Sequence, residues 1–209
     1  MAHREQIAME KRRAYLGWEY WGRPVPSFGD PRARLLVVGL APGAHGSNRT
    51  GRMFTGDRAG DFLYRALWEA GFANQPESLT REDGLTLSDA YITAPVRCAP
   101  PDNKPDRQEM AQCRPYFTRE LELLKHVRVV VLLGGIALES YLAVLLEQGR
   151  IASRGAFRFA HGAEFASYEG GPRLLCSYHP SQQNTSTKRL TAAMLGGIFL
   201  RARAILEAL

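Results

Sequence analysis

The sequence predicts a single α/β domain, a three-layer α/β/α sandwich around a mainly parallel, four-stranded central sheet. Two apolar runs, 34–40 and 127–135, are continuous rather than alternating, which is typical of strands buried on both faces. Segments with helical spacing separate the apolar runs, and this alternation favours parallel strands joined by helices that cover both faces of the sheet. A length of 209 residues is ordinary for one such domain, so residues 1–209 are assigned to it as a whole.

The first thirty residues predict an N-terminal helix and a proline-rich loop that pack on this core. Residues 3–20 are polar enough to form a mostly exposed helix, and three prolines then punctuate the segment WGRPVPSFGDP. The run 34–40 follows as the first strand. We expect the next segment, 41–56, to be a loop because it is rich in Gly, Asn, Ser and Thr.

The remaining elements follow from apolar runs, helical spacing and turn residues. Asp57 is a plausible N-cap for the helix after the first loop, and Gly71 would end that helix. Two short runs on either side of His161 and Gly162 indicate a hairpin. The expected strands are 34–40, 87–96, 127–135 and 174–178, the hairpin runs are 157–160 and 164–168, and the other helices are 106–125, 136–148 and 187–207.

Charge and cysteine content favour a cytoplasmic protein that binds a polyanion. The formal net charge is +6, and residues 1–60 hold ten Lys/Arg against five Asp/Glu. Three cysteines are too few for a secreted disulfide framework. The charged N-terminus is unlike a secretory signal, and the absence of an apolar run of membrane-spanning length argues against a membrane partner.

Three polar loops follow strands that are expected to be parallel. They are 41–56, 97–105 and 179–186, and ligands of parallel sheets bind beyond the carboxyl ends of the strands. The first loop, GLAPGAHGSNRTGRMFTGD, lets backbone N–H groups approach an anion or a carbonyl oxygen. It lacks the Gly-Lys-Ser/Thr of a phosphate-binding P-loop and the glycine spacing of a dinucleotide site.

The last loop, HPSQQNTSTKR, places His179 directly after a buried strand. Short polar side chains and two cations follow it, a mixture that suits contacts to a phosphodiester backbone and to base edges. Thr185 or Thr187 could also simply cap the final helix, and the two roles are compatible. The candidate DNA-contacting residues here are Ser181, Gln182, Asn184, Thr185 and Lys188.

The motifs GLAPGAHGSNRTGRMFTGD, TAPVRCAPPDNKP and SYHPSQQNT occur in that order and resemble those of the family 5 uracil-DNA glycosylases, often called type B. The resemblance extends from YWGRPVP (20–26) to the last helix. It implies a uracil-DNA glycosylase-like fold and a monofunctional DNA-repair enzyme. Such an enzyme hydrolyses the N-glycosidic bond of uracil, and of other deaminated bases such as hypoxanthine, in double-stranded DNA with the damaged base flipped out, and leaves an abasic site. We expect a monomer.

The resemblance also implies roles for single residues. Phe54 would stack on the flipped base, and His179 would donate a hydrogen bond to the oxyanion that develops on it. Ala41 stands where other members of the wider superfamily carry a water-orienting Asp or Asn, and this departure is associated with a broader base range. Asp57 is then the best replacement carboxylate as catalytic base, with helix capping as its alternative role. Further expected contacts are Gly43 and Ala41 at the base, Asn103 at the base edge, and His45 at water or DNA.

Similar family members carry a [4Fe-4S] cluster on four cysteines. Cys98 and Cys113 match the downstream pair, and no Cys-x2-Cys pair occurs in the 209 residues. Alignment on YWGRPVP would place the missing pair just before Met1, so either this sequence starts late or its lineage has lost the cluster. Two thiolates alone would not hold such a cluster. Cys176 is expected to be a small buried strand residue.

Two interpretations of a different class stay open. One is a non-catalytic DNA-binding or damage-sensing module that has kept the fold. The other is a small-molecule N-ribosyl hydrolase whose basic patch is incidental. A labelled duplex that contains uracil distinguishes them, because only the glycosylase leaves a site that alkali converts to a strand break.

Overall fold

The computed structural model describes residues 2–209 and shows a six-stranded sheet in the order β1-β3-β2-β4-β6-β5. Its four central strands are parallel and correspond to the four expected ones. They are β2 (Leu35–Val38), β3 (Ala90–Thr93), β4 (Val129–Leu133) and β6 (Arg173–Ser177). The expected α/β class and parallel centre are therefore confirmed.

Two short antiparallel strands extend the sheet beyond the four expected strands, at its edges. β1 (Phe28–Gly29) pairs with β3, and β5 (Glu164–Ala166) pairs with β6. The expected hairpin between 157–160 and 164–168 is wrong, because the second run pairs with β6 and the first forms no strand. Phe157 and Phe159 pack instead against the core beneath the sheet.

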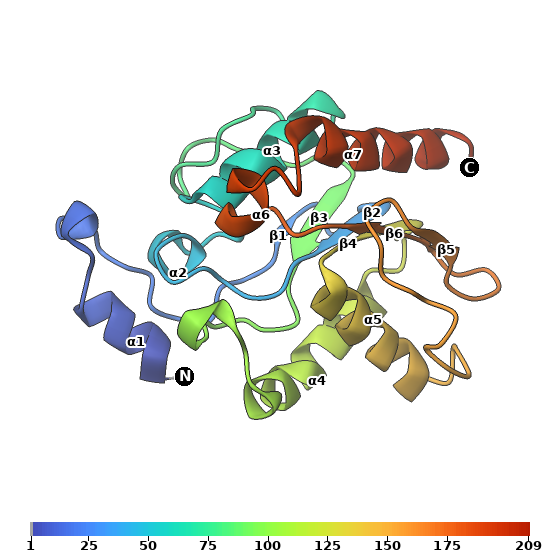
Figure 1. The fold of residues 1–209 in the computed structure, drawn as a ribbon, viewed down its shortest axis with the longest axis horizontal. Coiled ribbons are helices and arrows are strands. Elements are labelled where there is room, and N and C mark those ends of the chain that lie inside the picture. The colour runs from blue at the N-terminus through green and yellow to red at the C-terminus, as the bar shows by residue number, and fades with distance from the viewer. Residues whose placement is uncertain (1) are drawn as a thin grey trace.

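Helices cover both faces of the sheet (Figure 1). α3 (Arg58–Glu69) and α7 (Ala192–Glu207) lie on one face, and α4 (Arg107–Leu123) and α5 (Gly135–Glu147) lie on the other. Side chains alternate along β2 between the two resulting cores. Leu35 and Val37 face α3 and α7, whereas Leu36 and Val38 face α4 and α5. The three-layer sandwich follows directly from strands that are apolar on both faces.

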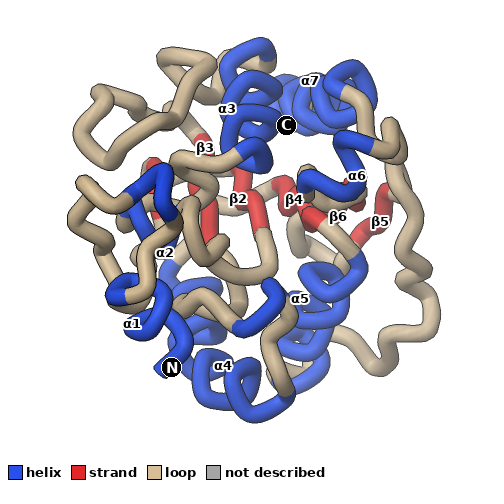
Figure 2. The backbone as a smooth tube through the Cα atoms, turned by 60° about the vertical axis from the view of Figure 1, so that its left-hand side comes forward, coloured by secondary structure: helices blue, strands red, loops and turns tan. Residues whose placement is uncertain are grey.

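The N-terminal segment differs from the continuous helix that was expected over 3–20. α1 (Ala2–Met9) is followed by an extended Arg12 and a 3-10 turn at Arg13–Tyr15. Aromatic side chains at 15, 18 and 20 turn toward the first loop, which an unbroken helix could not allow. α1 contacts α2 (Ser47–Thr50), a short helix inside the segment expected to be all loop (Figure 2).

The C-terminal segment also contains a break. α6 (Gln182–Ser186) precedes α7, so the expected single helix over 187–207 begins too early. Ser181 caps α6 and Thr191 caps α7 through their side chains, which corrects the suggestion that Thr185 or Thr187 caps the final helix. The middle loop carries a 3-10 turn, η2 (Pro101–Asn103).

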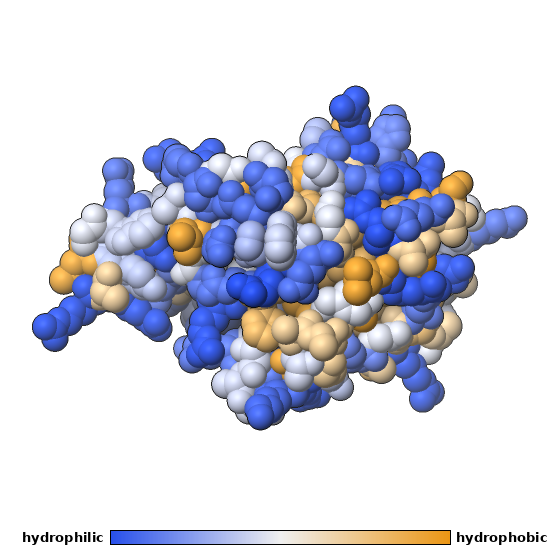
Figure 3. All heavy atoms as spheres, turned by 90° about the horizontal axis from the view of Figure 1, so that it is seen from above, coloured by the Kyte–Doolittle hydropathy of each residue, from blue (hydrophilic) through white to orange (hydrophobic). Residues whose placement is uncertain are grey.

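The surface seen from above is mostly hydrophilic, with apolar side chains in separate small groups (Figure 3). Among residues 2–209, no helix has the length and apolar character needed to cross a membrane.

Candidate active site at the carboxyl edge of the sheet

The first and last predicted loops meet where the parallel strands end. α2 belongs to the loop after β2, and α6 to the loop after β6, and both lie beside the strand ends (Figure 2). β2 and β6 both pair with β4, so only one strand separates these two loops. The topology therefore brings together the two segments that carry most of the predicted site.

Phe54 and His179 face each other across this edge. Their ring centroids are 5.8 Å apart, with the planes inclined by 32°. Phe54 is only 8% exposed, and its ring lies against Gly39, where an added Cβ would be 2.8 Å from Cε2 and Cζ. An aromatic face and an imidazole are therefore held close together, as recognition of a planar base requires.

The imidazole of His179 is neutral at physiological pH. Burial lowers its pKa to about 4. The ring forms no hydrogen bond with any described residue, although the backbone oxygen of His179 accepts one from Asn184 Nδ2 at 2.8 Å. A neutral imidazole can donate a hydrogen bond to a developing anion without transferring a proton to it.

The backbone holds Phe54 in an uncommon conformation. Its φ is 53°, in the left-handed region that bulky residues rarely adopt. Ser47 Oγ accepts a hydrogen bond from the Phe54 N–H at 2.9 Å. Gly60 is needed beside it, because a Cβ there would lie 1.8 Å from the Phe54 carbonyl oxygen. Strain of this kind persists only where surrounding contacts fix it.

Asp57 caps α3 as expected and also has a free carboxylate oxygen. Oδ1 accepts a hydrogen bond from the Gly60 N–H at 3.0 Å, whereas Oδ2 forms none with the described residues. Oδ2 lies so close to the first loop that a Cβ on Gly46 would be 2.0 Å from it. Burial raises the pKa of Asp57, although the Gly60 N–H partly opposes this. Capping and catalysis are thus compatible roles for one carboxylate.

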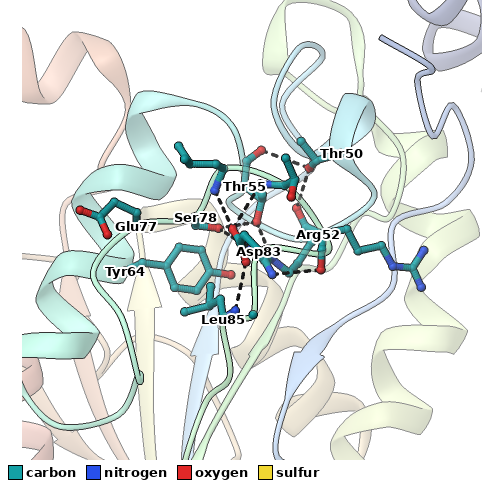
Figure 4. A network of polar contacts seen from close by, with 12 residues as sticks. Thr50, Arg52, Thr55, Tyr64, Glu77, Ser78, Asp83 and Leu85 are labelled. Carbon is teal, nitrogen blue, oxygen red and sulfur yellow. Dashed lines mark hydrogen bonds and ion pairs between the residues drawn. The ribbon is translucent and has the colours of Figure 1, made fainter.

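A buried polar network supports the end of the first loop (Figure 4). Arg52 is paired with Asp83 at 2.7 Å, and Arg52 Nε donates to Thr55 Oγ1 at 2.9 Å. Burial alone would raise the pKa of Asp83, yet hydrogen bonds from Arg52 and from two backbone N–H groups lower it. Tyr64 on α3 donates to the Met53 carbonyl oxygen at 2.7 Å. The residues flanking Phe54 are therefore anchored on both sides.

The N-terminal segment is anchored to α2 through Arg49. The Arg49 guanidinium lies 4.1 Å from the ring centroid of Tyr15 and 4.0 Å from that of Trp18. It also donates to the backbone oxygens of His45 and Gly56, both at 2.8 Å. Nothing in the sequence marked this cation as a structural centre, because its aromatic partners lie more than thirty positions away in the chain.

His45 belongs to this same arrangement. Its Nδ1 forms a hydrogen bond with the Tyr20 hydroxyl at 2.9 Å, and its ring stacks on Tyr15. Burial lowers the pKa of His45, and the nearby charges of Arg12 and Arg49 add to this effect. The contact with water or DNA expected for His45 stays a prediction, whereas its structural role is clear.

The polar residues of α6 divide into two groups. Ser181 caps the helix, Asn184 holds the His179 backbone, and Thr185 Oγ1 donates to the Ser181 carbonyl oxygen at 3.1 Å. The side chains of Gln182 and Lys188 form no polar contact with described residues and are exposed. Contact of these five residues with DNA remains a prediction.

The other predicted base contacts are spread along the edge. Ala41 and Gly43 lie in the first loop, and the approach of Asp57 Oδ2 leaves little room for a larger residue at Gly43, where a Cβ would be 2.9 Å away. Asn103 is exposed at the end of η2 with a φ of 55°, and the structure records no contact from it to Phe54 or His179. Its role at the base edge is therefore untested.

The described residues do not supply a complete ligand set for a [4Fe-4S] cluster. Cys98 and Cys113 are buried free thiols, and Cys98 Sγ accepts a hydrogen bond from Arg4 Nη1 at 2.7 Å. No group of three or more His, Cys, Asp or Glu suited to a metal ion occurs within residues 2–209. Two thiolates are half of what the cluster needs, so no chemical step is assigned to it.

Comparison with known proteins gives the family. A family model described as the uracil DNA glycosylase superfamily matches residues 26–200. A type-5 uracil-DNA glycosylase of Mycobacterium leprae is 51% identical over 201 residues, which cover 96% of this chain and 86% of the relative. One of Thermus thermophilus is 51% identical over 203 residues, covering 97% and 89%. The chain belongs to the type-5 uracil-DNA glycosylase family.

Membership of this family agrees with the motifs that pointed to it. Another type-5 uracil-DNA glycosylase, from Pyrobaculum aerophilum, is 45% identical over 92% of this chain and 80% of its own length. A type-4 uracil-DNA glycosylase of the same organism is 33% identical over only 54% of this chain. Sequence reasoning found the family and the site loops, but it missed Arg49, Ser47 and the Arg52–Asp83 pair, which hold those loops in place.

Proposed function

We propose that this chain is a DNA-repair glycosylase that removes uracil, and other deaminated bases such as hypoxanthine, from double-stranded DNA. The observation that carries the proposal is the pairing of a neutral His179 with the ring of Phe54 at the carboxyl edge of the sheet. The proposal is also supported by the type-5 uracil-DNA glycosylases that are 51% identical to this chain over the aligned residues.

Recognition would begin with the flipped base. The base would stack on the ring of Phe54, which is fixed against Gly39. The His179 N–H would donate to a carbonyl oxygen of the base, the atom on which negative charge develops as the N-glycosidic bond lengthens. Hypoxanthine also has a carbonyl oxygen, so one donor can serve both bases.

The chemical step is a hydrolysis. The bond between the sugar C1′ and the base nitrogen breaks, and its electron pair leaves with the base, whose charge the neutral His179 stabilises by hydrogen bonding. Water forms the new bond to C1′ of the oxocarbenium-like sugar and loses a proton. The products are an abasic site and the base anion, which becomes the free base by taking a proton from the solvent.

Asp57 would accept the proton from the attacking water. Its Oδ2 forms no hydrogen bond within the described chain, and its raised pKa makes the carboxylate a better base. Ala41 occupies the position at which the wider superfamily carries a polar residue that orients water. A carboxylate from the other end of the same loop would therefore orient the water here.

DNA would bind along the edge that carries both loops. Contacts to phosphates would come from the basic residues of 1–60, from the exposed side chains of α6 and from Lys188. The protein would act as a monomer in the cytoplasm. Cys98 and Cys113 match the family's downstream cluster ligands, and the proposed hydrolysis does not depend on a cluster.

A labelled uracil-containing duplex tests the proposal under single-turnover conditions. His179→Ala should lower the cleavage rate by about 10²–10³-fold, the usual cost of one lost oxyanion donor, with little change in DNA affinity. His126→Ala is a matched control, because His126 is exposed between α4 and β4 at the far end of the sheet.

Three results would refute the proposal or replace it. Near-normal cleavage by His179→Ala would remove His179 from the mechanism. A chain that retards the uracil duplex and never yields an alkali-sensitive site would be a damage-binding module. Hydrolysis of free nucleosides without cleavage of the duplex would make it a small-molecule N-ribosyl hydrolase.

A further inference from the structure

The turn over residues 160–163 lies beside the carboxyl end of β6, and the proposed function makes no use of it. The Ala163 N–H donates to the Ala160 carbonyl oxygen at 3.1 Å, and Gly162 takes the left-handed conformation at a φ of 79°. Two backbone hydrogen bonds attach the turn to β6. The Gly162 N–H donates to the Cys176 carbonyl oxygen at 2.8 Å, and the Cys176 N–H donates to the Ala163 carbonyl oxygen at 2.9 Å. His161, the second residue of this turn, is therefore held at the strand end that leads into the active site.

The imidazole of His161 accepts a hydrogen bond from the backbone just before the proposed catalytic histidine. The Tyr178 N–H donates to His161 Nδ1, with 3.3 Å between the two nitrogens. A backbone N–H can only donate, so Nδ1 carries no proton and the neutral ring holds its proton on Nε2. Burial lowers the pKa of His161, which agrees with a neutral ring. His161 thus satisfies a backbone donor at the point where the pairing of β5 with β6 has ended.

Ring contacts also join His161 to the loop after β6. The rings of His161 and Tyr178 are stacked, with centroids 5.3 Å apart and planes inclined by 24°. The Arg189 guanidinium lies 4.7 Å from the centroid of the same Tyr178 ring. Tyr178 therefore links the turn to both ends of the loop that carries His179. Packing alone could account for a ring at position 161, so its packing and its hydrogen bond have to be separated experimentally.

Side chains hold the backbone on both sides of His179. Asn184 Nδ2 donates to the His179 carbonyl oxygen at 2.8 Å, and His161 holds the Tyr178 N–H that precedes it. We propose that His161 is a positioning residue for His179, because its Nδ1 fixes the chain in the path that turns the His179 ring toward Phe54 and the flipped base. This inference rests on the proposed function, since it concerns the donor to the base. A displacement of a catalytic group by about 1 Å can cost 10²-fold in rate, so such a contact matters to the reaction.

Two substitutions at position 161 separate the hydrogen bond from the packing. His161→Asn keeps an acceptor oxygen close to the place of Nδ1 and loses the stacked ring, whereas His161→Phe keeps a ring and loses the acceptor. We expect single-turnover cleavage of the uracil duplex to fall about tenfold in His161→Phe and less than about threefold in His161→Asn. The dissociation constant for the duplex should stay unchanged in both. His126→Phe and His126→Asn are matched controls, because His126 is exposed at the far end of the sheet.

A double-mutant cycle tests whether His161 acts through His179. In the background of His179→Ala, His161→Phe should lower the residual rate no further, since the donor that it positions is absent. Long-range NMR correlations between the ring nitrogens and ring protons of histidine give a readout that is independent of cleavage. In the wild-type chain we expect the His161 signals, identified by their loss in His161→Asn, to show the Nε2–H tautomer.

Several outcomes would overturn the proposal. Cleavage by folded His161→Phe at the wild-type rate would show that the acceptor is not needed, and an equal loss of rate in both variants would show that the ring only packs. Weaker duplex affinity in place of slower cleavage would make His161 a DNA contact. An Nδ1–H tautomer would exclude the hydrogen bond. These results refute the inference alone, whereas a wild-type chain that never cleaves the duplex would refute the proposed function and this inference with it.

Discussion

Replacement of Arg49 by methionine should impair cleavage without touching the proposed catalytic groups. Arg49 is 4% exposed, donates to two backbone oxygens at 2.8 Å, and lies about 4 Å from the ring centroids of Tyr15 and Trp18. Methionine keeps much of the side-chain volume and loses all of these polar interactions. The two charged hydrogen bonds and two cation–π contacts together predict a loss of about 2–5 kcal/mol in the free energy of unfolding.

Loss of the Arg49 contacts should also lower the rate of cleavage. Arg49 joins the N-terminal segment to α2, and Ser47 at the start of α2 fixes the backbone of Phe54. A shift of the loop by about 1 Å can cost 10²-fold in rate, so we expect cleavage by Arg49→Met to fall about 10- to 100-fold. Arg49→Lys should lie between Arg49→Met and wild type, because it keeps the charge and loses the planar fork.

Urea denaturation followed by single-turnover cleavage measures both effects. Conditions in which each variant is fully folded separate a slow reaction from a reduced folded fraction. Arg13→Met is the matched control, because Arg13 lies in the same segment but is exposed. Cleavage by folded Arg49→Met at the wild-type rate would refute the claim that the N-terminal segment positions the site, whatever its effect on stability.

Three further predictions test the remaining site residues. Protonation of Asp57 removes the proposed base, so the single-turnover cleavage rate should fall as pH is lowered through the raised pKa of Asp57. The residual activity of Asp57→Asn should not show this fall at acidic pH. An unchanged fall in that variant would exclude Asp57 as its source. If Lys188 contacts a phosphate, Lys188→Ala should flatten the dependence of log affinity on log salt by about one unit, and an unchanged slope would show no such contact. The 209-residue chain should purify colourless, because Cys98 and Cys113 give two ligands where four are needed; stoichiometric iron in it would show that the ligands are misassigned.

The sequence predicted the parts of the molecule that are determined by residues close together in the chain. Continuous apolar runs predicted β2 and β4, the mixed runs 87–96 and 174–178 predicted β3 and β6, and Asp57 followed by a helical pattern located the start of α3. β1 escaped prediction because its two residues are too few for a periodic pattern, whereas β5 lies within the expected run 164–168 and only its pairing partner was wrong. The contacts that hold the loop of Phe54 in place were not predicted, for another reason. Arg52 and Asp83, or Arg49 and Trp18, become partners only through the fold, and charged residues in a loop are usually exposed.

Burial has the same effect on both proposed catalytic groups. It favours the neutral form of each, lowering the pKa of His179 to about 4 and raising that of Asp57. For His179 this ensures a neutral donor at neutral pH, which stabilises an anion without being consumed by proton transfer. For Asp57 it produces a stronger base. One desolvated edge thereby prepares a neutral hydrogen-bond donor and a base on two loops far apart in the chain. The same desolvation requires the anchoring by Arg49 and Arg52, because a loosened loop would admit water and relax both pKa shifts.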